Sequence, residues 1–458
     1  MNSYRTSSYV SDIELSENTE DDKDDNLYEN EGNSNITIDE VTSYLFIKSN
    51  SVLSAVLNIC ASTFGAGCLT YPHFVDKVGI INSLIIYIFV SICLYYSFDL
   101  LRSFAVDSEY YSFSVMTERV LGKKWLMVYA LSSSIFYLSG IMGYMNVCYS
   151  IFRTLWSDVK DYRRYIFGLI YLFITYIIEI FLCLYTRITT RVHLFSIIVI
   201  MAFSVFVVII VIGGIKECKT EKFEKERYFN PFDDNSTSNK IFFEFIYTSI
   251  MYIYGFSYHS TFPTFLGNVS TIATTSKKVN LISFGTICSA YMIISFFGYL
   301  YEDEVPDQLF LGDMNNSNDF LDIFLRVVAF IFLFTLIPHR YITIRDGYKC
   351  IIGKQKFTNI KDLVMIVICL FIANAMVFID KEVVIEENKN FNFFSVFTNI
   401  FGGLLGVIIA FLLPAISYGA INGKTKPKAI IGYIISILFL VVGLLSVGYS
   451  INNEINSK

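Results

Sequence analysis

The stretch Asn58-Ile-Cys-Ala-Ser-Thr-Phe-Gly65-Ala66-Gly67-Cys-Leu-Thr-Tyr-Pro72 interrupts the first long apolar segment of the chain. A helix at membrane depth keeps its backbone groups bonded, so a Gly-Ala-Gly break is tolerated there only where the freed groups line a cavity. In many secondary transporters, such a break turns the positive end of a half-helix toward an anionic substrate group, and unwound carbonyls hold a coupling cation. The break therefore indicates a binding site, although Gly-x-Gly can also be a close-packing face of an intact membrane helix.

The composition is that of a chain that crosses a membrane many times. Hydrophobic residues make up 54% of the 458 residues and charged residues 17%, and the mean hydropathy is +0.52. A bilayer core roughly 30 Å thick needs about 20 apolar residues per span, and about eleven segments meet that requirement. We expect these spans near residues 49–75, 78–101, 124–152, 165–185, 191–214, 241–266, 279–301, 319–340, 361–380, 393–418 and 428–450.

The two ends of the chain lie outside these spans. Residues 1–48 contain a cluster of acids from Asp21 to Asp25, which predicts a disordered, solvated tail. A basic end followed by an apolar core is missing there, so no signal peptide is predicted. Residues 49–451 form the predicted transmembrane transporter domain, and residues 452–458 form a short C-terminal tail.

The loops predict the orientation of the chain. Loops that follow even-numbered spans are basic, as in residues 119–124, 345–356 and 424–428, whereas residues 302–319 are acidic and contain no lysine or arginine. Because basic loops stay on the cytosolic side, we expect a cytosolic N-terminus. The membrane itself is expected to be the plasma membrane or that of a vacuole or another acidic organelle.

A second interruption falls in the sixth predicted span. The stretch Ile253-Tyr-Gly255-Phe-Ser-Tyr-His259-Ser-Thr-Phe-Pro263 gathers Gly, Ser, His and Pro inside an otherwise apolar segment. Broken first and sixth helices are what an inverted repeat of five spans would produce, because corresponding positions of the two halves are then five spans apart.

These motifs together resemble the amino acid/auxin permease family, which includes sodium-coupled, proton-coupled and vacuolar amino acid transporters. The first break is similar to the family's first-span pattern, and His259-Ser-Thr-Phe-Pro263 is similar to the His-x-x-Phe-Pro of its vacuolar members. Further matches are Phe297-Gly-Tyr-Leu300, Pro338-His-Arg340, and Phe401-Gly402 through Leu413-Pro414 to Tyr418.

The resemblance implies an all-α polytopic membrane protein with the leucine-transporter architecture, a five-plus-five inverted repeat and an eleventh span. It also implies an L-amino acid substrate carried by alternating access, a monomer in the lipid bilayer and no nucleic-acid partner. Amides near Gly65 would bind the substrate carboxylate, and backbone near Gly255 would face its α-amino group and side chain. The implied substrate-binding residues are Thr63, Phe64, Gly65, Ala66, Gly67, Tyr254, Gly255, Phe256 and Ser257.

Sodium coupling is not expected, because sodium-coupled members carry oxygen-bearing side chains where this chain has Ala61, Ala329 and Ile331. A hard cation needs oxygen ligands, although backbone carbonyls near Ala61 could still contribute some. We expect coupling to H+ or facilitated diffusion. Ionisable residues within spans are candidates for a proton relay, which selects Glu179 and His259. The alternatives are a neutral His259 that steadies the unwound turn, and a Glu179 that pairs with a basic residue near a helix end.

Other classes of function lack their motifs. The chain has no Gly-x-x-x-x-Gly-Lys phosphate loop and no His-Glu-x-x-His zinc motif, and its nine cysteines show no metal-ligand spacing. We therefore expect no enzyme, cofactor or metal site. The alternative function is an amino-acid-sensing receptor that signals through residues 1–48, and a channel is a third. Four polar residues within the spans can line the site or pack in the core: Tyr137, Asn146, Thr335 and Asn399.

Overall fold

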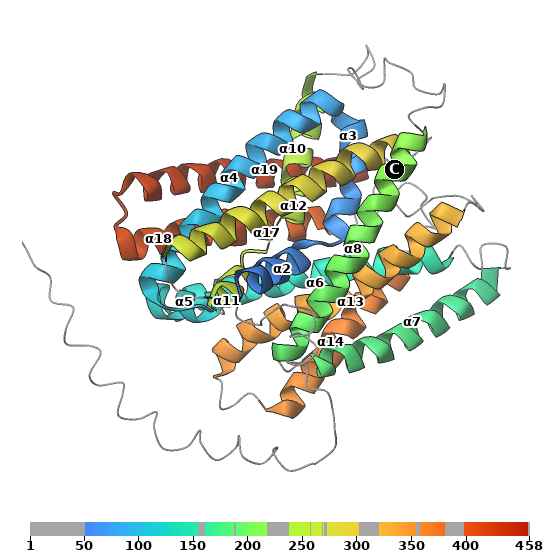
Figure 1. Cartoon of the computed structure of the whole chain (residues 1–458), viewed down its shortest axis with the longest axis horizontal. Helices are drawn as coiled ribbons and strands as arrows, with labels where there is room; N and C mark the ends of the chain where they lie inside the picture. The colour runs from blue at the N-terminus through green and yellow to red at the C-terminus, as the bar shows by residue number, and fades with distance from the viewer. Residues whose placement is uncertain are drawn as a thin grey trace, which may run out of the picture. The chain divides into compact units, whose positions relative to one another are not determined.

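A computed structural model describes residues 51–153, 161–186, 189–217, 238–256, 258–267, 269, 273–301, 320–353, 358–380 and 398–456. Within these ranges every regular element is a helix (Figure 1). In chain order they are α2 (Val52–Thr63), η2 (Ala66–Thr70), α3 (Tyr71–Val78), α4 (Ile80–Ser108), α5 (Phe113–Leu121), α6 (Lys123–Arg153), α7 (Asp161–Tyr185), α8 (Thr189–Glu217), α10 (Ser238–Gly255), α11 (Phe262–Gly267), α12 (Ala273–Tyr301), α13 (Phe320–Ile352), α14 (Asn359–Phe378), η6 (Thr398–Leu404), α17 (Leu405–Val407), η7 (Ile408–Leu412), α18 (Leu413–Asn422) and α19 (Pro427–Asn456).

Nine of the described helices are long and apolar enough to cross a membrane, and the bent pair Val52–Thr63 and Gly67–Val78 supplies a tenth candidate span. The sixth predicted span corresponds to α10, a short non-helical turn and α11. The predicted all-α polytopic fold is therefore confirmed. The count of eleven spans and the inverted repeat stay predictions.

The apolar side chains of this bundle face outward as well as inward. Large side chains such as Ile92 of α4, Phe173 of α7 and Leu444 of α19 are exposed, as expected where lipid surrounds a protein. The polar and small side chains gather inside instead, on α6, where Ser133 and Ser139 are fully buried. Because small residues let backbones approach closely, α6 packs along α13 in the interior of the bundle.

Two features differ from the expectation. The short helix α5, between α4 and α6, was not predicted. The eighth predicted span was expected to close at Pro338-His-Arg340, and that end point is wrong because α13 continues through Pro338 to Ile352. A proline is tolerated within a membrane helix where neighbouring groups satisfy the freed carbonyl.

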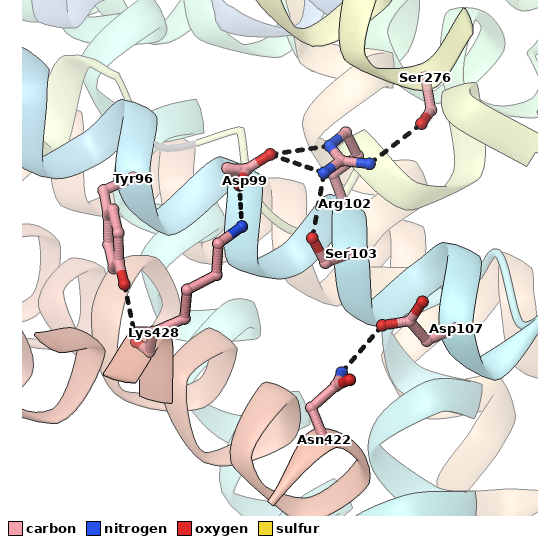
Figure 2. A network of polar contacts seen from close by, with 8 residues as sticks. All are labelled: Tyr96, Asp99, Arg102, Ser103, Asp107, Ser276, Asn422 and Lys428. Atoms are coloured by element: carbon pink, nitrogen blue, oxygen red, sulfur yellow. Dashed lines mark hydrogen bonds and ion pairs between the residues drawn. The ribbon is translucent and has the colours of Figure 1, made fainter. Parts of the chain in front are cut away.

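A polar network ties α4 to three other helices (Figure 2). Asp99 accepts two hydrogen bonds from the Arg102 guanidinium, at 2.9 and 2.7 Å, and one from the Lys428 ammonium at 2.9 Å. Arg102 also donates to the Ser276 hydroxyl of α12 at 3.3 Å. Farther along, the Asn422 amide of α18 donates to Asp107 at 2.8 Å. The network links α4 to α12, α18 and α19.

Candidate functional site

The first break begins where α2 ends. The Phe64 amide makes the last α-helical bond, to the Cys60 carbonyl at 2.9 Å, and Gly65 is extended, with φ −177° and ψ −172°. The chain then resumes as η2 and α3, and the two half-helices are bent by 52° relative to each other. The predicted interruption at Gly65 is therefore present in the fold. Because the first amides of a helix have no partner within it, they point out of the start of the second half-helix.

The second break follows Gly255. The Tyr258 amide bonds to the Phe256 carbonyl only two residues earlier, at 2.9 Å, and a new turn begins when Thr261 and Phe262 donate to the Tyr258 carbonyl. Helix α11 starts at Phe262. The helix is therefore interrupted between Gly255 and Phe262.

The two breaks touch each other. A Cβ added to Gly67 would lie 2.7 Å from the Gly255 Cα, so the two glycines bring backbone directly against backbone. On the other side of Gly255, a Cβ would overlap the Tyr71 hydroxyl, which donates to the Tyr252 carbonyl at 3.1 Å. Residues from both predicted halves of the site thus meet at one point in the bundle.

Tyr291 of α12 joins the two breaks through hydrogen bonds. Its hydroxyl donates to the Thr63 carbonyl at 2.7 Å and shares the same proton with the Gly255 carbonyl at 3.3 Å. Thr63 and Gly255 are the last residues of α2 and α10, and the carbonyls at the end of a helix have no hydrogen-bond donor within that helix. An unpaired buried carbonyl costs about 1–3 kcal/mol, so this hydroxyl stabilises both interruptions.

Aromatic rings surround the breaks. Phe64 stacks on Phe203 of α8, with ring centroids 3.8 Å apart, and Phe256 meets the Tyr291 ring edge-on at 5.0 Å. Tyr254 meets Phe136 of α6 edge-on at 5.4 Å. The predicted site residues Phe64, Tyr254 and Phe256 therefore form walls of the region where the helices unwind.

A buried cation lies beside the first break, and the sequence did not reveal it. Arg340 of α13 is 9% exposed, and its Nε donates to the Tyr144 hydroxyl at 2.6 Å. That hydroxyl is the group that a Cβ on Gly65 would overlap. The expectation that the eighth span closes at Arg340 concealed this position, since the residue lies well inside α13.

The remaining polar candidates have other partners. The Thr63 hydroxyl bonds to the Ile59 carbonyl of its own helix at 2.7 Å, and Thr335 bonds in the same way to Ile331 at 2.8 Å. Asn146 donates to the buried carboxylate of Asp380 at 3.2 Å. Three predictions cannot be placed: Ser257 lies outside the described residues, as do the side chains of Ala66 and Asn399.

The two proton-relay candidates lie in different surroundings. His259, in the second break, is fully buried and stacks on Phe98 with ring centroids 3.8 Å apart. Neither ring nitrogen has a hydrogen-bond partner among the described residues. Glu179 of α7 is also buried, and its Oε2 accepts a hydrogen bond from the Asn374 amide of α14 at 3.4 Å. No contact between His259 and Glu179, and no partner common to both, is found among the described residues.

A polar cavity of about 240 Å³ opens beside both breaks. Its lining includes Ser62 at the end of α2, Thr261 and Thr264 after the second break, and Thr343 and Asp346 of α13. Hydroxyl and carboxylate groups make this wall suitable for water and for a polar solute.

Comparison with known proteins identifies the family and the fold. Residues 48–455 match the family described as transmembrane amino acid transporter protein. No curated relative matches the sequence significantly. A manganese transporter from Eremococcus coleocola, in complex with an aromatic bis-isothiourea-substituted compound, has a similar structure, with a TM-score of 0.58 and 10% identity over 89% of this chain and 90% of that chain. A mutant of the same transporter has a TM-score of 0.55 at 10% identity, over 86% and 85%.

Proposed function

Because the chain belongs to the transmembrane amino acid transporter family, we propose that it is a secondary transporter that carries L-amino acids by alternating access. The observation that carries this proposal is the contact between two interrupted helices at Gly67 and Gly255. Broken helices that meet inside a bundle supply backbone donors and acceptors for a polar solute, so neither helix needs a charged side chain at the break.

The substrate carboxylate would bind at the start of the half-helix Gly67–Val78. The N-terminal amides of a helix and its dipole favour an anion there. The α-amino group would face the second break, where Gly255 and Phe256 leave the helix. The polar cavity that begins at Ser62 and Thr261 would then lead the substrate to or from one side of the membrane.

We propose coupling to H+, or facilitated diffusion, rather than coupling to Na+. Freed carbonyls at the breaks are the usual ligands of a coupling cation in such folds, and here those of Thr63 and Gly255 both accept the Tyr291 proton. The Ser62 and Thr63 hydroxyls donate to the Ile59 carbonyl, at 2.9 and 2.7 Å. These oxygen atoms are already engaged in hydrogen bonds within the protein, and Ala61, Ala329 and Ile331 add no side-chain oxygen that a hard cation would need.

A metal ion is not proposed as the substrate, although the similar structures are those of a manganese transporter. At 10% identity the likeness extends to the fold alone. In the described part of the chain, no three His, Cys, Asp or Glu side chains are grouped so that they could hold a metal ion.

Uptake into proteoliposomes tests the proposal. Purified protein is reconstituted, and uptake of a mixture of labelled L-amino acids is measured with a pH gradient and a Na+ gradient imposed separately. We expect uptake driven by the pH gradient or running down the substrate's own gradient, unchanged when choline replaces Na+. A collapse of uptake in choline would refute the coupling assignment.

Gly65→Leu and Gly285→Leu form a matched pair of variants for this assay. The first substitution forces a side chain onto the Tyr144 hydroxyl, whereas nothing lies within 4 Å of a Cβ on Gly285 in α12. We expect uptake to be lost in Gly65→Leu and kept in Gly285→Leu. Amino acid binding without uptake under any gradient would favour the sensing receptor instead.

A further inference from the structure

Arg340 is a buried cation without an anionic partner in the described part of the chain. Its Nε donates to Tyr144 at 2.6 Å, and its guanidinium carbon lies 5.3 and 5.5 Å from the ring centroids of Tyr137 and Tyr144. No ion pair to a described Asp or Glu accompanies these contacts. An arginine does not lose its proton inside a protein, and aromatic faces offset only part of the cost of burying a charge.

Phenol groups and a glycine surround the guanidinium. On α6 the facing residue is Gly140, whose missing Cβ would lie 3.8 Å from the Arg340 Nε and 3.9 Å from the Tyr254 hydroxyl. Phenol groups from α6 and α10 thus converge on the guanidinium, and Gly140 contributes no side chain to the facing wall. Since Nε is engaged by Tyr144, the two terminal nitrogens form the planar fork that matches a carboxylate.

The position of Arg340 connects it to the first break. Only the Tyr144 hydroxyl separates the guanidinium from Gly65, where the proposed carboxylate site begins. Arg340 and the proposed carboxylate site are thus neighbours across a single tyrosine side chain.

We propose that Arg340 binds the side-chain carboxylate of the substrate, so that the transported class is acidic L-amino acids such as glutamate and aspartate. The inference rests on the proposed function, since it assumes that the break holds the α-carboxylate. Charge balance supports it: a zwitterionic amino acid leaves the buried guanidinium uncompensated, whereas an acidic amino acid brings one net negative charge. A buried charge without a counter-ion is strongly unfavourable. In this proposal the side-chain carboxylate of the substrate is the counter-ion of Arg340.

Competition between isosteric substrates tests this assignment. Glutamate and glutamine, and likewise aspartate and asparagine, have nearly the same shape and differ in the charge of the side chain. Uptake of each labelled compound into proteoliposomes gives kcat/KM, and we expect the acids to exceed their amides by roughly tenfold or more, as for a charge-assisted bidentate contact. This ratio for the unaltered protein decides the matter even if every variant misfolds.

Variants then locate the selectivity. Arg340→Gln is expected to remove the preference for acids by the same factor while uptake of glutamine persists, and Arg340→Lys to keep part of it because charge remains but the fork is lost. Tyr144→Phe removes the hydroxyl that holds Nε, so we expect reduced selectivity from a misplaced guanidinium. Arg326→Gln, nearer the start of the same helix, is the matched control and should leave the ratio unchanged.

The outcomes separate this inference from the proposed function. Equal uptake of glutamate and glutamine, or an equal loss of both in Arg340→Gln, would overturn the side-chain assignment and leave an amino acid transporter whose Arg340 binds the shared α-carboxylate or supports the fold. Absence of uptake for every amino acid, in any gradient, would instead refute transport itself.

Discussion

Replacing Gly67 by alanine tests whether the two broken helices have to touch. The new Cβ would lie 2.7 Å from the Gly255 Cα and 3.4 Å from its backbone nitrogen. Ordinary van der Waals contact begins near 3.4 Å, so the two backbones would have to separate by about 0.7 Å. Neither atom belongs to a side chain that could rotate away, and the whole crossing must therefore open.

The cost of opening follows from what spans the crossing. Overpacking of this kind costs about 1–3 kcal/mol. The separation also pulls the Thr63 and Gly255 carbonyls apart. Because both accept a hydrogen bond from the same Tyr291 hydroxyl, at least one of these bonds would weaken. We expect Gly67→Ala to lower the thermal midpoint of the purified protein and to reduce proteoliposome uptake roughly tenfold or more, since about 1.4 kcal/mol corresponds to tenfold.

The matched control is Gly285→Ala in α12, because its new Cβ would have no atom within 4 Å. This change should not destabilise the protein and can raise its stability by up to about 1 kcal/mol, because alanine favours a helix over glycine. The two variants are compared by uptake and by thermal stability. For the latter, each sample is heated and the fraction of protein that remains unaggregated is measured by size-exclusion chromatography. The reasoning fails if Gly67→Ala equals Gly285→Ala in both measurements.

Three further substitutions test other contacts. Tyr291→Phe leaves two carbonyls at the breaks without their donor, so we expect a loss of about 1–3 kcal/mol in chemical denaturation and weaker uptake; unchanged stability would contradict the bridging role. Asp99→Asn removes the carboxylate that pairs with Arg102, so the thermal midpoint of this variant should fall more than that of Lys428→Gln, which loses only an exposed ion pair that contributes at most about 1 kcal/mol. Equal midpoints would argue against the network. Glu179→Gln should abolish uphill accumulation under a pH gradient but keep counterflow exchange if Glu179 carries the coupling proton, and retained accumulation would exclude it.

The spans and both breaks could be predicted because their signals are local. A run of about 20 apolar residues identifies a span without reference to the rest of the chain. The glycines at 65 and 67 likewise mark an interruption wherever the surrounding segment is apolar. For this reason most predicted segments coincide with described helices, apart from the late end of α13 and the unpredicted α5.

The partners across the site could not be predicted in this way. Tyr291 reaches the Thr63 carbonyl from a position 228 residues later in the sequence, and Tyr144 reaches Gly65 from α6. Tyrosine is common throughout this chain, with 32 copies, so composition does not distinguish these two. Their roles depend on which face of α6 and α12 turns inward, and neither helix has a pronounced apolar face that would define it.

Arg340 shows how a local rule can fail at the position that we propose to bind the substrate. Pro338 and the polar residues after it, which include Arg345 and Asp346, predict the end of a span, yet α13 continues to Ile352. The continuation is explained by its surroundings, because Thr343, Arg345 and Asp346 line the polar cavity beside the breaks. A polar helical segment is stable inside a bundle when it faces such a cavity instead of lipid. Arg340 precedes these residues in the same continuous helix, which keeps it inside the bundle, where it is 9% exposed.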